Sequence, residues 1–144
     1  MNYLPSLVKK VQVYVGLAIA RDSYLIVGAA VMQHRTPEAM QALADQLPLA
    51  QRYCTDGLAI YPELVYPAAG KHILSVNKEE THTVESSNAN LRTYLGRLRR
   101  ASRCFSRKLE ALWRAVRLFV WHHNRRQRAI LANPKLKNAL TLVF

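Results

Sequence analysis

The chain has 144 residues, half of them apolar, which is enough for one domain with a hydrophobic core. Its formal net charge of +12 comes mostly from residues 92–128, which carry twelve Lys or Arg and one acid. So dense a basic block beside a near-neutral body is typical of a polyanion binder, with nucleic acid as the first candidate and an anionic membrane as the second. The two cysteines, Cys54 and Cys104, form no C-x-x-C pair, and no pair of histidines has the spacing of zinc ligands, which argues against a zinc finger.

Two apolar runs near the N-terminus are too short to cross a membrane. Residues 11–20 and 24–32 are separated by Arg21 and Asp22, and each run is about half of the roughly 20 residues that a spanning helix needs. The first ten residues lack the apolar core of a signal peptide. We therefore expect a cytoplasmic protein without a membrane partner.

Residues 11–32 have the pattern of a β-hairpin. The runs VQVYVGLAI (11–19) and YLIVGAAVM (24–32) are rich in β-branched and aromatic residues, and Arg-Asp-Ser at 21–23 interrupts them. Because the runs are apolar almost throughout, we expect helices to cover both faces of these strands.

A helix and a further strand are predicted next. Thr36 is the expected N-cap, Pro37 the first helical position, and Pro48 ends the helix. Residues 51–55 are a strand candidate that delivers Asp56 at its C-terminal end, where open α/β sheets place their chemistry. Residues 58–80 predict a short helix, a loop and a weak strand at 72–76.

Two helices complete the predicted order. The first spans about 81–103, with Thr81 or Thr83 as cap and Glu85 in the first turn, where the helix dipole favours an ionised carboxylate. The second spans about 106–131, has Trp113 and Phe119 at core spacing, and ends at Asn133-Pro134. The order strand, strand, helix, strand, helix, helix predicts a mixed α/β fold.

Asp56 and Glu85 are the acids best placed for chemistry. Carboxylate oxygens suit Mg²⁺ or Mn²⁺, and two such ions about 4 Å apart can activate a hydroxyl and stabilise a leaving oxygen in phosphoryl transfer. A Thr-Asp-Gly sequence also makes an ordinary turn, and a first-turn Glu is common on a solvated amphipathic helix. From the residues alone, Asp56 and Glu85 can be either metal ligands or ordinary residues of a turn and of a solvated helix.

Three segments resemble the DDE transposases of the insertion-sequence-one type. They are Tyr53-Cys54-Thr55-Asp56-Gly57 with Tyr61, the E-x-x-N-x-N-L-R run from Glu85 to Arg92, and Ser102-Arg103-Cys104-Phe105-Ser106. The match extends from about residue 11 to residue 127. It implies a ribonuclease-H-like catalytic domain over residues 1–128, with a basic helical part at 81–128 and a long basic C-terminal helix, followed by a tail at 129–144.

The resemblance also implies an activity and its site. The activity is cleavage and joining of DNA in the transposition of an insertion sequence. Asp56 and Glu85 would be the catalytic residues and the ligands of Mg²⁺ or Mn²⁺. The partner would be double-stranded DNA, at the element ends and at the target, bound by a homo-oligomer or by a co-assembly with full-length transposase. The expected DNA contacts are Asn88, Arg92, Arg97, Arg99, Arg100 and Arg103, and the density of the last four favours contact with the DNA backbone over plain solvation.

One part of the family pattern is missing. The family's first catalytic Asp lies on the first strand, in an Asp-Glu-x-Trp context, and no such stretch precedes residue 11. Asp22 lies in the predicted hairpin turn, where a solvated turn residue is the ordinary interpretation. We therefore expect a truncated transposase, or one half of a product whose upstream reading frame supplies the missing strand. The alternative is a non-catalytic basic DNA-binding remnant that modulates an intact transposase.

Overall fold

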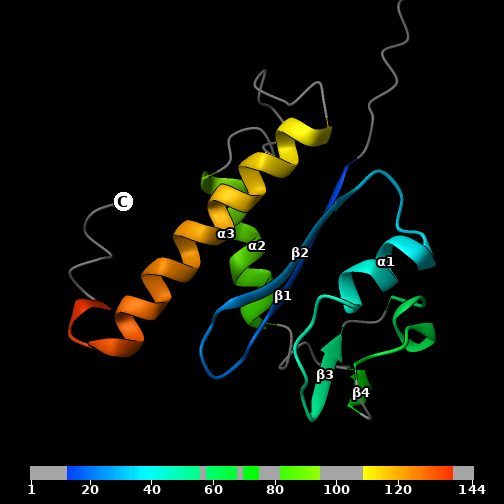
Figure 1. Cartoon of the computed structure of the whole chain (residues 1–144), viewed down its shortest axis with the longest axis horizontal. Coiled ribbons are helices and arrows are strands. Elements are labelled where there is room, and N and C mark those ends of the chain that lie inside the picture. Colours follow the sequence, from blue (N-terminus) through cyan, green and yellow to red (C-terminus); the bar gives the residue numbers. More distant parts are fainter. Residues whose placement is uncertain (1–12, 56–57, 68–69, 75–81, 95–108, 138–144) are drawn as a thin grey trace, which may run out of the picture.

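A computed structural model describes residues 13–55, 58–67, 70–74, 82–94 and 109–137 (Figure 1). These residues form two small sheets and three α-helices, which confirms the predicted mixed α/β class. In chain order the elements are β1 (Tyr14–Ile19), β2 (Ile26–Met32), α1 (Pro37–Ala44), β3 (Arg52–Thr55), the 3₁₀ turn η1 (Tyr61–Glu63), β4 (Lys71–Leu74), α2 (His82–Tyr94) and α3 (Leu109–Ala132).

Strands β1 and β2 form the predicted hairpin. They are antiparallel, with Leu17 opposite Ala29, and the register shifts between Ala18 and Ile19. The turn is closed by backbone hydrogen bonds, in which the Tyr24 N–H donates to the Ala20 carbonyl at 2.8 Å. Tyr24 has φ 57°, a left-handed backbone conformation that residues other than glycine and asparagine rarely adopt.

Helices cover both faces of this hairpin, as predicted (Figure 1). Successive strand residues point to opposite faces, so the hairpin contributes to two separate core clusters. On one face α2 and α3 complete a cluster of Leu17, Ile26, Ala29, Leu91, Leu112 and Val116. Trp113 and Phe119 pack against that cluster, as their spacing predicted. On the other face α1 and the η1 region complete a cluster of Met32, Met40, Ala44 and Leu64.

Helix α1 begins where the sequence predicts. The Thr36 side-chain oxygen accepts a hydrogen bond from the Ala39 N–H at 3.2 Å, and Pro37 is the first helical residue. The helix lies very close to β1, because a Cβ at Gly16 would be 2.7 Å from Leu43 Cδ2. The absence of a side chain at position 16 therefore leaves room for the end of the Leu43 side chain.

Strands β3 and β4 form a second, parallel pair with Tyr53 opposite His72. The strand expected at 51–55 is confirmed, and the weak strand expected at 72–76 appears as β4, with residues 75–76 outside the described ranges. Within those ranges the β3–β4 sheet has no strand paired with the β1–β2 sheet. The described chain therefore holds two separate two-stranded sheets.

Helices α2 and α3 correspond to the predicted basic helical part. Helix α2 ends at Tyr94, and residues 95–108 lie outside the described ranges, so the predicted extension to 103 is not tested. Thr83 lies inside α2, and its prediction as a cap was therefore wrong. Helix α3 ends at Ala132, directly before Asn133-Pro134, as predicted.

Two side chains of the C-terminal half of α3 contact the backbone of the hairpin. The His123 Nε2 lies 2.9 Å from the Tyr24 carbonyl oxygen, and Asn124 hydrogen-bonds the backbone of Ile26. These contacts hold the long helix along β2 and the hairpin turn.

Candidate functional site

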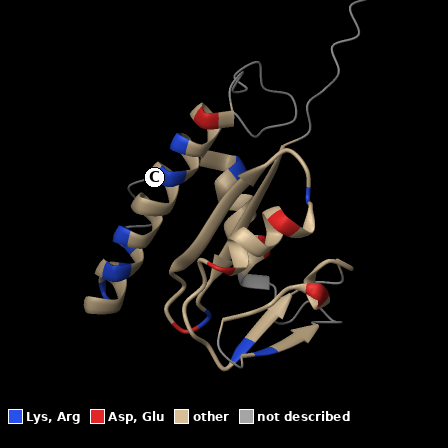
Figure 2. Cartoon of the chain, turned by 45° about the vertical axis from the view of Figure 1, so that its right-hand side comes forward, with Lys and Arg blue, Asp and Glu red and all other residues tan. Residues whose placement is uncertain are grey.

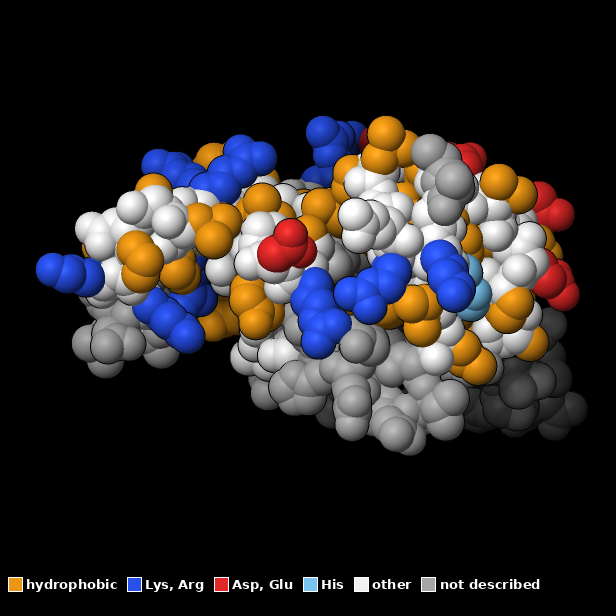
Figure 3. All heavy atoms as spheres, turned by 90° about the horizontal axis from the view of Figure 1, so that it is seen from below, with side chains coloured by type: hydrophobic (Ala, Val, Ile, Leu, Met, Phe, Trp, Pro, Cys, Tyr) orange, Lys and Arg blue, Asp and Glu red, His pale blue; other side chains and the backbone are white. Residues whose placement is uncertain are grey.

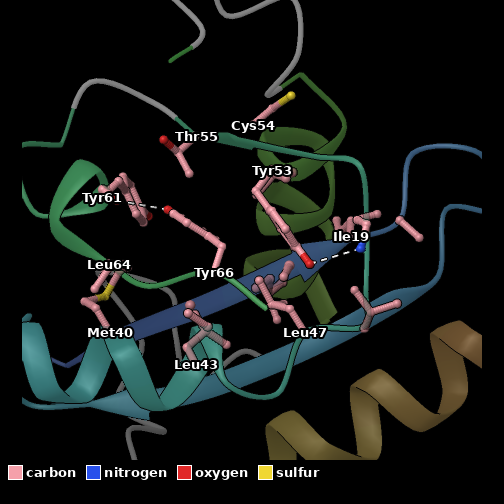
Figure 4. Close-up of a pocket in the computed structure, with 18 of the residues that line it drawn as sticks. Ile19, Met40, Leu43, Leu47, Tyr53, Cys54, Thr55, Tyr61, Leu64 and Tyr66 are labelled. Atoms are coloured by element: carbon pink, nitrogen blue, oxygen red, sulfur yellow. Dashed lines mark hydrogen bonds between the residues drawn. The ribbon is translucent and has the colours of Figure 1, made fainter. Parts of the chain in front are cut away.

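A cavity of about 900 Å³ lies between the two sheets (Figure 4). β1 and the hairpin turn form one side, and β3 forms another. Residues of β2, of α1, of α2 as far as Arg92 and of the segments 47–51 and 61–66 also line it. The cavity therefore collects residues from all parts of the chain that the sequence singled out, except the basic segment after residue 94.

An aromatic wall closes the β3 side of the cavity. The Tyr53 and Tyr66 rings stack with centroids 5.0 Å apart, and Tyr66 stacks on His72 at 5.1 Å. The Tyr53 hydroxyl donates to the Pro48 carbonyl at 2.7 Å and accepts from the Ala50 N–H at 3.0 Å (Figure 4). These bonds hold the ring of Tyr53 between β3 and the hairpin.

Tyr66 holds its phenolic proton more tightly than an exposed tyrosine does. Its hydroxyl donates to the Tyr61 carbonyl at 3.1 Å. Burial raises the pKa of Tyr66 to about 12, because the phenolate would lose hydration, and the nearby Tyr61 adds to the shift. Tyr66 is therefore a hydrogen-bond donor throughout the physiological pH range.

His72 and Thr55 meet at the end of the β3–β4 pair. The His72 Nε2 lies 2.7 Å from the Thr55 Oγ1. The imidazole thus contacts the residue that directly precedes Asp56 in the sequence. Sequence reasoning did not single out His72, although a parallel pairing of the two predicted strands would have brought it beside β3.

Glu85 and the end of β3 line the same cavity. Glu85 lies in the first turn of α2 with an exposed side chain, and Thr55 is the last residue of β3. Asp56 directly follows Thr55 and lies outside the described residues. Glu85 and strand β3, which ends directly before Asp56, therefore border the same cavity.

The other predicted residues of α2 share this face. Glu85, Asn88 and Arg92 all line the cavity, as expected for residues three, four and seven positions apart on a helix. Asn88 is half-buried and Arg92 is exposed. The predicted DNA contacts in the following segment lie outside the described residues; they are Arg97, Arg99, Arg100 and Arg103.

Two acids of the described chain line the cavity, and they come from different elements of the fold. Asp22 is exposed in the hairpin turn, as the sequence predicted, and Glu85 comes from α2. Both offer hard oxygen donors of the kind that Mg²⁺ and Mn²⁺ prefer. Among residues with a described position, no group of three or more His, Cys, Asp or Glu side chains gathers around one point.

Helix α3 carries more basic residues than any other element of the described chain. Lys and Arg recur along this helix in Figure 2, and they gather in Figure 3 at the end of the molecule that the C-terminal half of α3 forms. Trp121 is 56% exposed here, and the Arg125 guanidinium carbon lies 5.3 Å from the centre of its ring. The arginines of this helix are Arg114, Arg117, Arg125, Arg126 and Arg128, against the single acid Glu110.

No helix in the described ranges is long and apolar enough to cross a membrane, in line with the expectation from the short apolar runs. No protein-family model, curated protein or solved structure matches this chain.

Proposed function

We propose that this chain is the catalytic part of a DDE-type transposase, in which Asp56 and Glu85 hold a divalent metal ion. The observation that carries the proposal is the shared cavity. Glu85 reaches it from α2, and β3 leads to it and ends immediately before Asp56. This arrangement matches what phosphoryl transfer needs, namely acids from two different elements beside a space open to a ligand.

A ribonuclease-H-like sheet is the architecture that we infer for the whole domain. An antiparallel hairpin, a parallel pair and helices on both faces of the hairpin are all present. In such a sheet a further strand would lie between β1 and β3. The two sheets of the described chain would then be the two sides of one mixed sheet.

The residues of the cavity have distinct roles in this proposal. Mg²⁺ or Mn²⁺, when bound, would neutralise phosphate charge and promote attack of a hydroxyl on phosphorus. Glu85 and Asp56 would bind the ion through carboxylate oxygens. Arg92 lies two turns after Glu85 on the same face of α2, so its guanidinium would approach a phosphate held at the cavity and stabilise its charge. Asn88, between them, would hydrogen-bond the DNA backbone.

Double-stranded DNA is the partner that we propose, in a homo-oligomer or a co-assembly with an intact transposase. Arg97, Arg99, Arg100 and Arg103 follow α2 and would extend the contact from the cavity along the DNA backbone. The arginines of α3 offer a second basic surface.

Metal binding tests the role of Glu85 directly. Titration of the full chain with Mn²⁺, followed by the relaxation of water protons, should give a saturable site that Glu85→Gln weakens at least tenfold. Glu110→Gln is the matched control, because it removes the same charge from an exposed position on α3. Equal Mn²⁺ affinity in the parent chain and in Glu85→Gln would contradict the proposal.

A non-catalytic DNA-binding remnant is the second candidate. It is favoured by α3, which carries five arginines and one acid and leaves Trp121 exposed beside Arg125. Such a module would bind a short fluorescent DNA duplex equally well in chelator and in Mn²⁺, and Glu85→Gln would leave the affinity unchanged. A transposase catalytic site should instead bind the duplex more tightly when Mn²⁺ is added.

A further inference from the structure

The outer face of α3 combines an exposed aromatic ring with exposed arginines. Its residues are Arg117, Leu118, Trp121, Arg125 and Arg128, which recur at helical spacing. Trp121 is 56% exposed and Leu118 is 65% exposed. The three arginines are also exposed, and Figure 3 shows Lys and Arg around apolar side chains at this end of the molecule. Trp121 therefore lies within a row of cations on the surface.

The inner face of the same helix is occupied by the core. Leu112 and Val116 are 5% and 0% exposed in the cluster that α3 shares with the hairpin, and Phe119 packs against that cluster. Trp121 lies on the opposite side of the helix and takes no part in the cluster. An indole that the core does not bury is available to a ligand.

The charge of the outer face selects an anionic ligand. Glu110 is the single acid of α3, and it forms an ion pair with Arg114 at the start of the helix. The arginines around Trp121 lie further along the helix, where its sequence has no acid. Two copies of this face would repel each other, which argues against self-association through α3. A polyanion is the complementary partner.

A nucleic acid fits this face better than an anionic membrane does. A helix that lies in a lipid surface buries a broad apolar face in the bilayer, and the broad apolar face of α3 is the one that covers the hairpin. Between its arginines the outer face offers only Leu118 and Trp121 as large apolar side chains. Phosphate contacts need the arginines alone, and the exposed indole then has to be explained.

The indole favours a single strand over a closed duplex. In a duplex the bases are stacked on one another, so a helix that contacts the phosphates meets no free base. The bases of a single strand can stack on an aromatic side chain while arginines contact its phosphates. The Arg125 guanidinium carbon lies 5.3 Å from the centre of the Trp121 ring, and an arginine in this position adds a cation–π contribution to such a platform.

We propose that the outer face of α3 binds single-stranded DNA, with an unpaired base stacked on Trp121 and the flanking arginines on the phosphates. From Arg117 to Arg128 the row spans about 16 Å at about 1.5 Å per residue, the length of about five nucleotides of a stacked strand at about 3.4 Å each. The assignment rests on the proposal above that the chain binds DNA, and it adds an unpaired segment as the form that α3 binds. No residue of the row lines the cavity, so the assignment holds whether or not the chain cuts DNA.

Two oligonucleotides of equal charge test the stacking step. The probe is a fluorescein-labelled strand of twelve thymidylates, and its control is a labelled strand of equal length in which every nucleotide is abasic. The control keeps the phosphates and lacks the bases. Anisotropy is measured with the full chain in chelator, which removes any contribution of a metal site. We expect at least fivefold tighter binding of the thymidylate strand, because stacking of one base on an aromatic ring contributes about that factor or more.

Protein variants assign the binding to this face. Trp121→Leu keeps an apolar side chain at an exposed position, and it should lower the affinity for the thymidylate strand to that for the abasic strand. Unlabelled thymidylate strand should quench the tryptophan fluorescence of the parent chain, and this quenching should be absent in Trp121→Leu. Arg117→Gln should weaken binding of both strands and reduce the slope of log K against log salt by about 0.7. Lys71→Gln, the same charge change at an exposed position of β4, should alter neither affinity nor slope.

Several results would overturn the assignment. Equal affinity for the thymidylate and abasic strands, or undiminished binding by Trp121→Leu, would remove Trp121 as a stacking platform. Tighter binding of a uridylate strand than of the thymidylate strand would assign the face to RNA. A blue shift of tryptophan emission on vesicles of equal parts phosphatidylserine and phosphatidylcholine, with no quenching by the thymidylate strand, would assign it to a membrane. Because all strands are tested in chelator, failure here and failure of the metal site at Glu85 are separate results.

Discussion

The side-chain amide of Asn124 makes two hydrogen bonds to the backbone of Ile26. Its Nδ2 donates to the Ile26 carbonyl at 2.8 Å, and its Oδ1 accepts from the Ile26 N–H at 2.8 Å. The two residues are 98 positions apart in the sequence. The amide thus does for β2 what a neighbouring strand would do, and it fixes the position of α3 along the hairpin.

Removal of this amide should destabilise the fold. Asn124→Ala leaves a part-buried N–H and carbonyl of Ile26 without their partner, and we expect a loss of about 1–3 kcal/mol in the free energy of unfolding. Urea denaturation measures it, and amide exchange at Ile26 should accelerate. Arg128→Ala, at an exposed position of the same helix, is the control. Equal stability of Asn124→Ala and the parent chain would show that the two bonds contribute nothing.

The left-handed backbone of Tyr24 predicts an unusual stabilising substitution. At φ 57° a side chain costs about 1 kcal/mol or more, which glycine avoids. Tyr24 is half-exposed, so Tyr24→Gly loses little packing and should raise the melting temperature, whereas Tyr24→Val should lower it. A lower melting temperature for Tyr24→Gly than for the parent chain would argue against strain at this turn.

Gly70 should not tolerate a side chain. A Cβ at this position would overlap the Tyr53 ring and lie 2.6 Å from the carbonyl oxygen of Ala50. The ring is held by its own hydrogen bonds and by Tyr66, so we expect Gly70→Ala to cost about 1–3 kcal/mol in urea denaturation. At Gly28 a Cβ would lie 3.0 and 3.3 Å from the flexible ends of two leucine side chains and at an ordinary contact distance of 3.5 Å from the Ala18 Cβ, so Gly28→Ala should cost less.

Tyr66 should make stability fall at high pH. Its pKa in the folded chain is about 12, above the ordinary value of 10, so the folded state holds the phenolic proton more tightly than the unfolded state. The resulting stabilisation is complete below pH 10 and is lost as the pH rises toward 12. Tyrosinate absorbance should include a late step from Tyr66, and Tyr66→Phe should remove that step. A late step that persists in Tyr66→Phe would assign it to another tyrosine.

Salt dependence should distinguish the two basic surfaces. If Arg99, Arg100 and Arg103 contact phosphates, their joint replacement by glutamine should reduce the slope of log K against log salt for DNA binding by about three units. The matched triple variant on α3 replaces Arg117, Arg125 and Arg128. An unchanged slope in the first variant and a reduced one in the second would move the DNA contact to α3.

Local sequence signals predicted the elements well. The hairpin, the Thr36 cap and the end of α3 before Asn133-Pro134 all depend on neighbouring residues, which a reader of the sequence can see. Thr83 was misplaced as a cap because Thr81 and Thr83 have the same chemistry two positions apart. Helix boundaries commonly shift by that amount.

Contacts between residues far apart in the chain could not be predicted from the sequence. The pairing of Asn124 with Ile26 joins residues 98 positions apart, and nothing in the local pattern of α3 distinguishes this amide from a solvated one. The Thr55–His72 contact needed the parallel register of β3 and β4. For the candidate site, the sequence placed Glu85, Asn88 and Arg92 on one face of a helix, and the structure added the cavity that this face borders.

Metal-dependent DNA cleavage tests the central claim most directly. Supercoiled plasmid would be incubated in Mn²⁺ with the chain and with the same chain extended upstream by a strand that carries an aspartate, each with and without Glu85→Gln and Asp56→Asn. We predict nicking by the extended chain that either substitution abolishes and that chelator stops. Nicking that survives both substitutions, or none by either form of the chain, would contradict a catalytic role for Asp56 and Glu85.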